Sequence, residues 1–306
     1  MRLLRSIPIL AACFLAFSSS QLSAAPIDLN DGQHAVHLPD TPKRVVVLEF
    51  SFLDSLAAVD VTPVGAADDG DANRVLPRVR QAIGQWTSVG LRSQPSIEEI
   101  ARLKPDLIVA DLNRHQALYS DLASIAPTLL LPSRGEDYQG SLKSAELIGK
   151  ALGKSAQMEA RIQENREHLK AIAQQIPAGA SVLFGVARED SFSVHGPDSY
   201  AGSVLEAIGL KVPAVRANAA PTEFVSLEQL LALDPGWLLV GHYRRPSIVD
   251  SWSKQPLWQV LGAVRTQHVA EVDGDSWARN RGVLASEQIA EDALAILKGG
   301  KAVLSQ

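Results

Sequence analysis

"SIEEIARLKPDLIVAD" (Ser96–Asp111) and "SLEQLLALDPGWLLVG" (Ser226–Gly241) are two versions of one sixteen-residue phrase. In both, a serine able to cap a helix is followed by leucines and isoleucines at helical spacing. A proline then stops the helix, and the apolar run after it is typical of a buried strand in a parallel sheet. The phrase therefore predicts the same helix-and-strand unit twice, in two lobes of similar fold.

The chain around each copy continues to alternate short apolar runs with helical segments. In the first half we expect strands at 44–50, 62–68, 106–111 and 127–133, with helices near 52–59 and 96–103. In the second half we expect strands at 181–187, 191–196, 237–243 and 268–273, with helices near 199–208, 226–233 and 283–297. This order is typical of βα units, so the predicted class is α/β, with parallel sheets in two Rossmann-like lobes.

The segment from 139 to 175 lacks proline and is rich in good helix formers, so it predicts one long linker helix. Gly149 and Gly153 are the positions where such a helix could break. Unbroken, it would reach about 50 Å, enough to join two lobes. The expected organisation is an N-terminal lobe at 26–138, a linker helix at 139–176 and a C-terminal lobe at 177–306.

The first 25 residues differ from the rest, because Arg2 and Arg5 precede an apolar run and a stretch of small residues. This pattern predicts a cleaved secretory signal peptide at 1–25, and hence an exported protein. Cleavage at "LAAC" would instead leave Cys13 lipidated, but the short apolar run before Cys13 favours ordinary cleavage. Cys13 is the only cysteine, which excludes a disulfide scaffold and a thiolate metal site.

Charge and missing motifs exclude several functions. Removal of residues 1–25 takes two arginines with it and changes the formal charge from −5 to −7, which disfavours binding to nucleic acid. No G-x-G-x-x-G, G-x-x-x-x-G-K-[ST], G-x-S-x-G or H-E-x-x-H sequence occurs, and the seven histidines form no metal-binding pattern. We therefore expect no enzyme, no cofactor and no metal site formed by the protein itself.

Arginine recurs just after the predicted strands, where ligands bind in open α/β sheets. The residues are Arg114, Arg134, Arg188, Arg244, Arg245, Arg279 and Arg281, with Arg92 just before the first copy of the phrase. Guanidinium groups carry a permanent charge and paired donors that match a carboxylate. A cleft lined by several of them predicts a compact, multiply carboxylated anion as the ligand, with Tyr243 and Trp277 as apolar walls.

Five segments give the mature chain a resemblance to a known family: "TPKRVVVLEFSFLDSLAAVDVTPVGAADD", "TSVGLRSQPSIEEIARLKPDLIVAD", "GSVLEAIGL", "LLALDPGWLLVGHYR" and "SWARNRGVLASEQIAEDAL". They resemble the helix-linked substrate-binding proteins that serve iron–siderophore and cobalamin ABC importers. The resemblance covers the whole mature chain. It implies a monomeric carrier that captures ferric dicitrate, with the iron held by citrate, and docks on two transmembrane subunits of an importer. It also implies a small closure angle between the lobes.

The resemblance further assigns individual residues. It places Glu98 and Glu228 at the outer tips of the lobes, where they would pair with arginines of the transmembrane subunits, with Glu99 as a substitute for Glu98. Without that role, both glutamates would simply face the positive end of a helix dipole. The resemblance assigns Arg92 to the siderophore. Strand-end position and resemblance together assign Arg114, Arg134, Arg188, Arg244 and Arg279.

Other interpretations are open at this point. The same fold could carry a hydroxamate or catecholate siderophore, heme or cobalamin, but these larger ligands require more aromatic lining than a chain with 5% aromatic residues suggests. A secreted α/β enzyme is disfavoured because no arrangement of nucleophile, base and oxyanion donors is recognisable. A purely adhesive or structural protein would leave the strand-end arginines unexplained.

Overall fold

The computed structural model describes residues 26–299, so the predicted signal peptide and Cys13 lie outside the described residues. The first lobe is built on a five-stranded parallel sheet of order β5-β4-β3-β8-β9. Its strands are β3 (Val45–Val47), β4 (Gly65–Ala66), β5 (Thr87–Ser88), β8 (Leu107–Asp111) and β9 (Thr128–Leu131). Its helices are α1 (Phe50–Ala57), α2 (Pro77–Ile83), α3 (Ile97–Arg102), α4 (Leu112–His115) and α5 (Tyr119–Ile125). Two hairpins complete it, β1 (Ile27–Asn30) with β2 (Ala35–Leu38) and β6 (Gly90–Leu91) with β7 (Gln94–Pro95).

The strands of this sheet direct alternate side chains into two apolar layers. Along β3, Val45 and Val47 belong to one core cluster, while Val46 and the following Leu48 belong to another. Burial on both faces explains why such strands occur in the sequence as unbroken apolar runs.

The second lobe has a five-stranded sheet of order β12-β11-β10-β13-β14. Its strands are β10 (Val182–Ala187), β11 (Phe192–His195), β12 (Thr222–Phe224), β13 (Trp237–His242) and β14 (Val269–Val272). The prediction of a parallel sheet is wrong for one of them, because β11 runs antiparallel to both of its neighbours, β10 and β12. Only a tight turn joins β10 to β11, which permits a hairpin but not the long crossover that parallel neighbours need.

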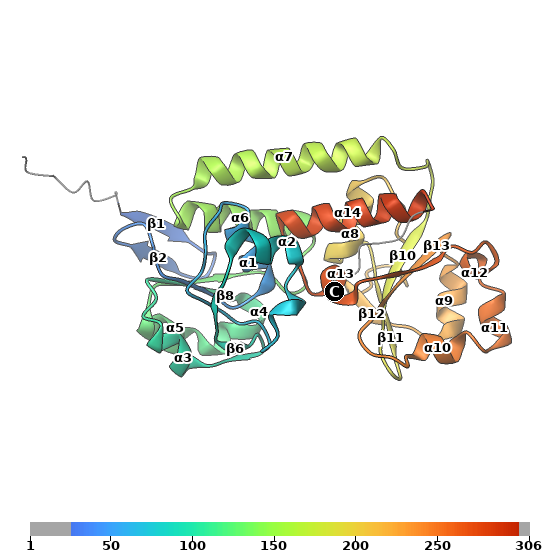
Figure 1. Ribbon diagram of the computed structural model, residues 1–306, viewed down its shortest axis with the longest axis horizontal. Helices are drawn as coiled ribbons and strands as arrows, with labels where there is room; N and C mark the ends of the chain where they lie inside the picture. Colours follow the sequence, from blue (N-terminus) through green and yellow to red (C-terminus); the bar gives the residue numbers. More distant parts are fainter. Residues whose placement is uncertain (1–25, 300–306) are drawn as a thin grey trace, which may run out of the picture.

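Seven helices surround the second sheet. They are α8 (Tyr200–Ala207), α9 (Leu227–Leu233), α10 (Ile248–Trp252), α11 (Pro256–Gln259), α12 (Gly262–Arg265), α13 (Gly274–Ala278) and α14 (Val283–Leu297). Helices α9 to α12 follow the outer part of the lobe in Figure 1, whereas α8, α13 and α14 lie toward the first lobe.

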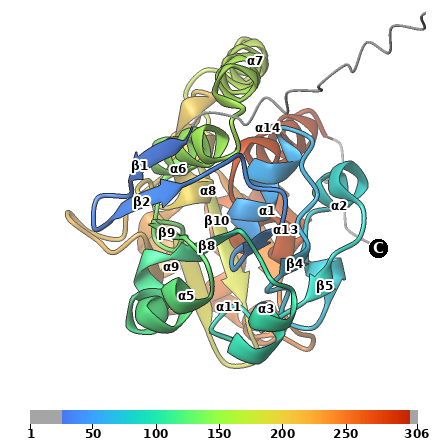
Figure 2. The ribbon, with the colours of Figure 1, turned by 90° about the vertical axis from the view of Figure 1, so that its left-hand side faces the viewer.

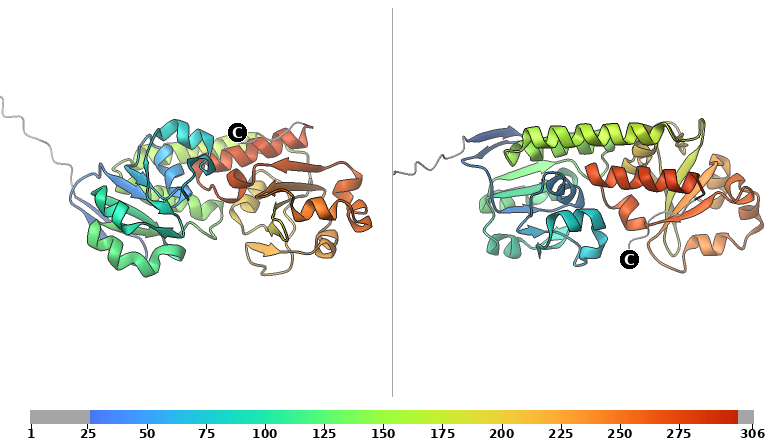
Figure 3. Two further views of the ribbon diagram at one scale, coloured as in Figure 1. Left: turned by 60° about the horizontal axis from the view of Figure 1, so that its bottom comes forward. Right: turned by 45° about the horizontal axis from the view of Figure 1, so that its top comes forward.

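The segment expected to form one long helix forms two, α6 (Tyr138–Ala151) and α7 (Ser155–Ala173), which pack against each other. The chain turns between them at Gly153, the second candidate break position, where a φ of +66° favours glycine. Helix α7 alone is about 28 Å long and spans both lobes (Figure 1; Figure 3, right). Among residues 26–299, no helix is both long and apolar enough to cross a membrane.

One core cluster is shared by the two lobes. It contains Val47 and Leu53 of the first lobe, Phe184 and Leu239 of the second, and Ile289 of α14. Helices α6, α7 and α14 contribute to the same cluster, so the lobes rest on one continuous apolar layer.

Helix α14 is anchored to the first lobe at its amino end. The backbone N–H groups of Leu284 and Ala285 donate to the carboxylate of Asp54 in α1, at 3.1 and 2.9 Å. Figure 2, viewed from the end of the first lobe, shows α14 behind α1 and below α7. Burial raises the pKa of Asp54 to about 7, although these hydrogen bonds oppose the rise.

Both copies of the repeated phrase fold as predicted. Ser96 caps α3, and Ser226 caps α9 within a capping box. Lys104 and Asp234 each adopt a left-handed conformation, with φ of 47° and 36°, directly before the proline that precedes β8 or β13. The equivalence of the two phrases therefore extends to the backbone.

Candidate functional site

A cavity of about 280 Å³ lies between the two lobes. Six arginines line it: Arg92, Arg114 and Arg134 from the first lobe, and Arg188, Arg279 and Arg281 from the second. Most of them follow the carboxyl end of a strand, directly or after one short helix, and Arg92 lies in the turn between β6 and β7. The structure thus brings five of the predicted ligand arginines together and adds Arg281.

Arg92 is 3% exposed and rigidly held. Its Nε and Nη2 donate to Oδ2 of Asp69 at 3.1 and 2.7 Å, and its Nη1 donates to Oε2 of Glu49 at 3.4 Å. Its carbonyl accepts a hydrogen bond of 2.7 Å from His115 Nε2, because His115 Nδ1 already accepts the N–H of Asp111. Most of the donors of Arg92 are therefore occupied before any ligand arrives.

Glu49 is an acidic residue buried within this basic cavity wall. It is 1% exposed, and its Oε1 lies 2.9 Å from Nε of Arg114. Burial raises the pKa of Glu49 above its usual value, although Arg92 and Arg114 act in the opposite direction. Burial also acts to raise the pKa of Asp69, but hydrogen bonds from Arg92 more than offset this and hold that pKa below its usual value. Two carboxylates thus pair with Arg92 and Arg114 of the first lobe.

Three of the arginines, Arg134, Arg188 and Arg281, have no ion pair with a carboxylate among residues 26–299. Arg188 donates from Nη1 to the hydroxyl of Ser193 at 3.1 Å, and its guanidinium lies 5.0 Å from the ring centroid of Tyr243. Arg134 is exposed at the cavity edge. These three cations are available to an anionic ligand.

Arg279 and Arg281 lie on one short segment after α13. Arg279 pairs with Asp275 and stacks over Tyr243 at 4.1 Å. Arg281 donates to the carbonyls of Ala278 and Arg279 at 3.3 and 3.4 Å. Burial lowers the pKa of Arg281, so a negative partner for this guanidinium would be favourable.

The charges around the cavity do not cancel. Six guanidinium groups, which stay protonated in proteins, face the carboxylates of Glu49, Asp69 and Asp275. The excess positive charge is local, because the chain as a whole is acidic. Such a site suits a compact anion with several carboxylates, each matched to paired N–H donors.

His195 and Tyr243 add neutral polar groups to the wall. Burial, together with the nearby Arg281 and Arg188, lowers the pKa of His195 to about 3. The imidazole is therefore neutral at physiological pH and offers one donor and one acceptor. His195 also lines an adjoining hollow of about 140 Å³, which shares Arg134 and Arg281 with the cavity.

Two predicted ligand residues lie elsewhere than expected. Arg244 is exposed and does not line the cavity. Trp277 is 1% exposed, packs its ring against Phe184 and donates its indole N–H to Asp292 at 3.0 Å. Trp277 borders the adjoining hollow but is mainly a core residue, so its role as an apolar wall of the ligand site stays a prediction.

Sequence reasoning missed the acidic partners and the neutral histidine. Glu49 follows β3 in "VLEF", and so occupies the same kind of strand-end position as the arginines. His195 ends β11, but β11 runs antiparallel to β10, so its carboxyl end does not lie at the edge where the parallel strands end. Asp69 directly follows the strand predicted at 62–68. A search of strand ends for negative as well as positive charge would therefore have found Glu49 and Asp69, but not His195.

Glu98 and Glu228 occupy equivalent positions in the first turns of α3 and α9, and both are exposed. Glu98 pairs with Arg102 at 3.0 Å, while Glu228 has no ion pair with a basic side chain among the described residues. Hydrogen bonds from Ser226 and from its own N–H lower the pKa of Glu228. Each lobe therefore presents one accessible carboxylate.

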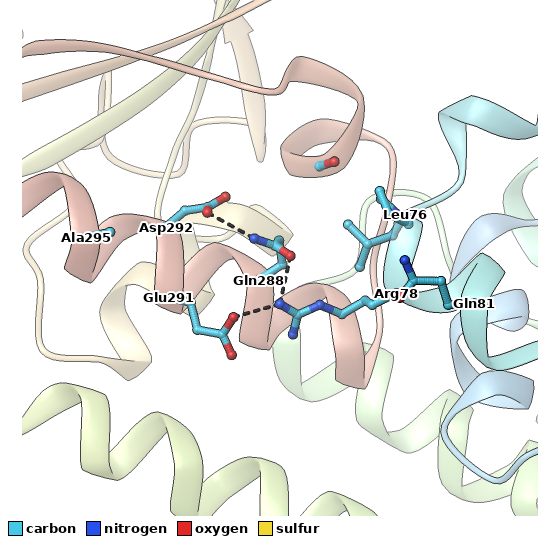
Figure 4. Close-up of a pocket in the computed structure, with 9 residues that line it drawn as sticks. Leu76, Arg78, Gln81, Gln288, Glu291, Asp292 and Ala295 are labelled. Carbon is cyan, nitrogen blue, oxygen red and sulfur yellow. Dashed lines mark hydrogen bonds and ion pairs between the residues drawn. The ribbon is translucent and has the colours of Figure 1, made fainter. Parts of the chain in front are cut away.

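A larger hollow of about 420 Å³ lies where α2 of the first lobe meets α13 and α14 (Figure 4). The one arginine on its wall, Arg78, donates to Gln288 and Glu291 at 2.7 Å each. Glu291 and Asp292 add negative charge to the wall. This hollow does not suit a polycarboxylate, and the arginine cavity is the better candidate despite its smaller volume.

Comparison with known proteins gives consistent relatives. The family described as "Periplasmic binding protein" matches residues 45–276. The chain is 52% identical over 259 residues to "Fe(3+) dicitrate-binding periplasmic protein FecB" of Escherichia coli, covering 85% of this chain and 86% of that protein. It is 40% identical over 268 residues to "Fe(3+)-citrate-binding protein YfmC" of Bacillus subtilis, covering 87% and 84%.

A solved structure shows the same fold. Staphylococcus aureus SirA in complex with staphyloferrin B aligns with a TM-score of 0.77 at 24% identity, covering 89% of this chain and 98% of that one. At this identity the likeness bears on the fold alone, and it extends over both lobes.

Proposed function

Because this chain belongs to the periplasmic binding protein family, we propose that it captures ferric dicitrate in the periplasm and delivers it to an ABC importer of the inner membrane. The observation that carries the proposal is the cavity lined by six arginines, three of them without a carboxylate partner among residues 26–299. Two relatives whose names specify iron citrate, at 52% and 40% identity, support the same cargo.

The proposed mechanism is capture without chemistry. Citrate oxygens hold the ferric ion, and the carboxylates that point outward meet guanidinium groups. Among residues 26–299 no group of three or more His, Cys, Asp and Glu side chains is arranged to hold a metal ion, so we assign the iron to citrate alone. Arg188 and Arg281 from one lobe and Arg134 from the other would contact the cargo first, since their charges are not yet paired.

Cavity size and lining favour citrate over the other cargoes of this fold. Catecholate siderophores, heme and cobalamin are large and bring flat apolar surfaces, which aromatic side chains bind well. Among residues 26–299, Tyr243 is the one Phe, Tyr or Trp residue that lines the cavity, and arginines form most of the polar wall. A small, highly charged complex fits this lining better.

Calorimetric titration tests the proposal. The purified protein, without residues 1–25, is titrated with ferric citrate, free citrate, a ferrichrome-type siderophore and heme. We expect heat and saturation with ferric citrate, and weaker or no binding of the others. Preference for heme or a hydroxamate would exclude ferric dicitrate as the cargo while leaving the carrier role.

Delivery would depend on the two lobes presenting matched charges. We assign Glu98 and Glu228, with Glu99 beside the first, to ion pairs with two transmembrane subunits. The carrier would act as a monomer after removal of a signal peptide at 1–25. Its parts would be a lobe at 26–138, a helical linker at 139–176 and a lobe at 177–306.

A further inference from the structure

Asn280 lies in the sequence between Arg279 and Arg281, two of the three cavity arginines of the second lobe, yet it is 2% exposed and belongs to the lobe junction rather than to the cavity wall. Its side chain makes three hydrogen bonds. Nδ2 donates to the carbonyls of Arg74 and Asp275 at 2.9 and 3.0 Å, and Oδ1 accepts the N–H of Leu76 at 3.0 Å. Both amide hydrogens and the oxygen are therefore used.

Two of these bonds cross between the lobes. Arg74 and Leu76 belong to the first lobe, just before α2, whereas Asp275 and Asn280 belong to the second. The side chain is thus a fixed spacer, because amide hydrogen bonds constrain both distance and direction. Few single side chains could replace it, since the site requires two donors and one acceptor on one planar group.

Arg74 also connects Asn280 to Arg92, the buried arginine on the first-lobe side of the cavity. Arg74, whose carbonyl accepts from Asn280, places its Nη1 3.4 Å from Oδ2 of Asp69. The same Oδ2 receives two hydrogen bonds from Arg92. One chain of contacts therefore runs from the Arg279–Arg281 segment through Asn280, Arg74 and Asp69 to Arg92.

We propose that Asn280 is a positioning residue that sets the separation between the second-lobe arginines and the first-lobe arginines, and so determines how tightly the cavity holds a rigid polycarboxylate complex. The inference rests on the proposed function for its ligand. Its physical basis is pre-organisation: groups already held at the correct separation lose less freedom when the ligand binds. A rigid metal complex cannot adjust to a wrong separation as a flexible anion can.

Arg78 provides the matched control, because it also joins the lobes. It reaches from α2 to Gln288 and Glu291 on α14, as Figure 4 shows. Neither partner lines the arginine cavity. If any contact across the junction affected binding in the same way, loss of Arg78 and loss of Asn280 would have equal effects.

The test compares wild type with Asn280→Ala, Asn280→Asp and Arg78→Met, each titrated with ferric citrate in a calorimeter. Asn280→Asp keeps the size and one acceptor but sets a second oxygen against the carbonyls of Arg74 and Asp275, so it is the more severe change, and Asn280→Ala serves if it does not fold. We expect both Asn280 variants to bind about ten- to hundredfold more weakly, because buried carbonyls lose their partners and the segment shifts. Arg78→Met should bind within about twofold of wild type.

A second measurement uses no ligand. Hydrogen exchange of peptides covering 274–283 should be faster in the Asn280 variants than in wild type, and unchanged in Arg78→Met. Asn280 variants that bind like wild type, or that are weakened no more than Arg78→Met, would overturn the proposal. If wild type itself binds no ferric citrate, the proposed function fails, and exchange in 274–283 alone decides whether Asn280 positions the segment.

Discussion

Replacement of Arg281 by methionine tests whether the arginine cavity is the ligand site. Arg281 lines both the cavity and the adjoining hollow, and it has no carboxylate partner among residues 26–299. Methionine keeps a long apolar stem but removes the charge and the donors. Loss of one hydrogen bond to a charged ligand costs about 1.5–3 kcal/mol, which lowers affinity roughly ten- to hundredfold.

The fold should tolerate this change. Burial lowers the pKa of Arg281, which means that the empty protein disfavours the charge at this position. Methionine removes this charge but also the hydrogen bonds to the carbonyls of Ala278 and Arg279, so we expect Arg281→Met to melt close to the wild-type temperature in scanning calorimetry. The variant thus separates a loss of binding from a loss of structure.

Arg244→Met is the matched control, since Arg244 is exposed and lies outside the cavity lining. Titration with ferric citrate should give wild-type affinity for this control and the predicted loss for Arg281→Met. Wild-type affinity in Arg281→Met would refute the placement of the ligand in the cavity. An equal loss in both variants would indicate general attraction by positive charge instead of a specific site.

Three further predictions concern carboxylates. Alanine at both Glu98 and Glu228 should abolish ferric citrate uptake by cells while calorimetry shows unchanged binding; weaker binding would mean that the glutamates are structural. Asp54 has a folded-state pKa of about 7, raised from 3.8, so the folded protein keeps a proton that the unfolded chain loses. The free energy of unfolding should therefore fall as pH rises from about 4 to about 7, and this dependence should be weaker in Asp54→Asn. A wild-type melting temperature that stays constant over this pH range would contradict the prediction. An anionic ligand should raise the pKa of Glu49 further, so the pH dependence of ferric citrate affinity should change in Glu49→Gln, and an unchanged pH dependence would exclude this coupling.

Most elements of the fold could be predicted because each depends on a few neighbouring residues. The cap at Ser226, the stop before Pro235 and the apolar run of β13 are local signals, and the structure confirms them. The antiparallel direction of β11 also has a local signal, because the turn that joins it to β10 is too short for the crossover that parallel neighbours need. The sequence offered both Gly149 and Gly153 as positions where the helix could break. The break occurs at Gly153 because α6 and α7 pack against each other on either side of it, and this packing is not visible in the sequence.

The candidate site could be predicted where its residues follow the carboxyl ends of parallel strands, because these ends lie at one edge of the sheet. That rule brings Arg114 and Arg188 to the cavity. It fails for Arg244, which is exposed and lies outside the cavity lining although the preceding Tyr243 belongs to it, and the next residue, Arg245, pairs with Glu271. The pairing of Arg92 with Asp69 joins segments 23 residues apart, and no local pattern predicts such a contact.

The apolar layer shared by the two lobes makes them a single cooperative unit. If either lobe unfolded alone, it would strip the other of part of the cluster that holds Val47, Phe184 and Ile289. Truncation at a lobe boundary would therefore yield two fragments with exposed apolar surface that aggregate, rather than two smaller folded proteins. A substitution deep in one lobe should lower the melting point of both, with a single thermal transition.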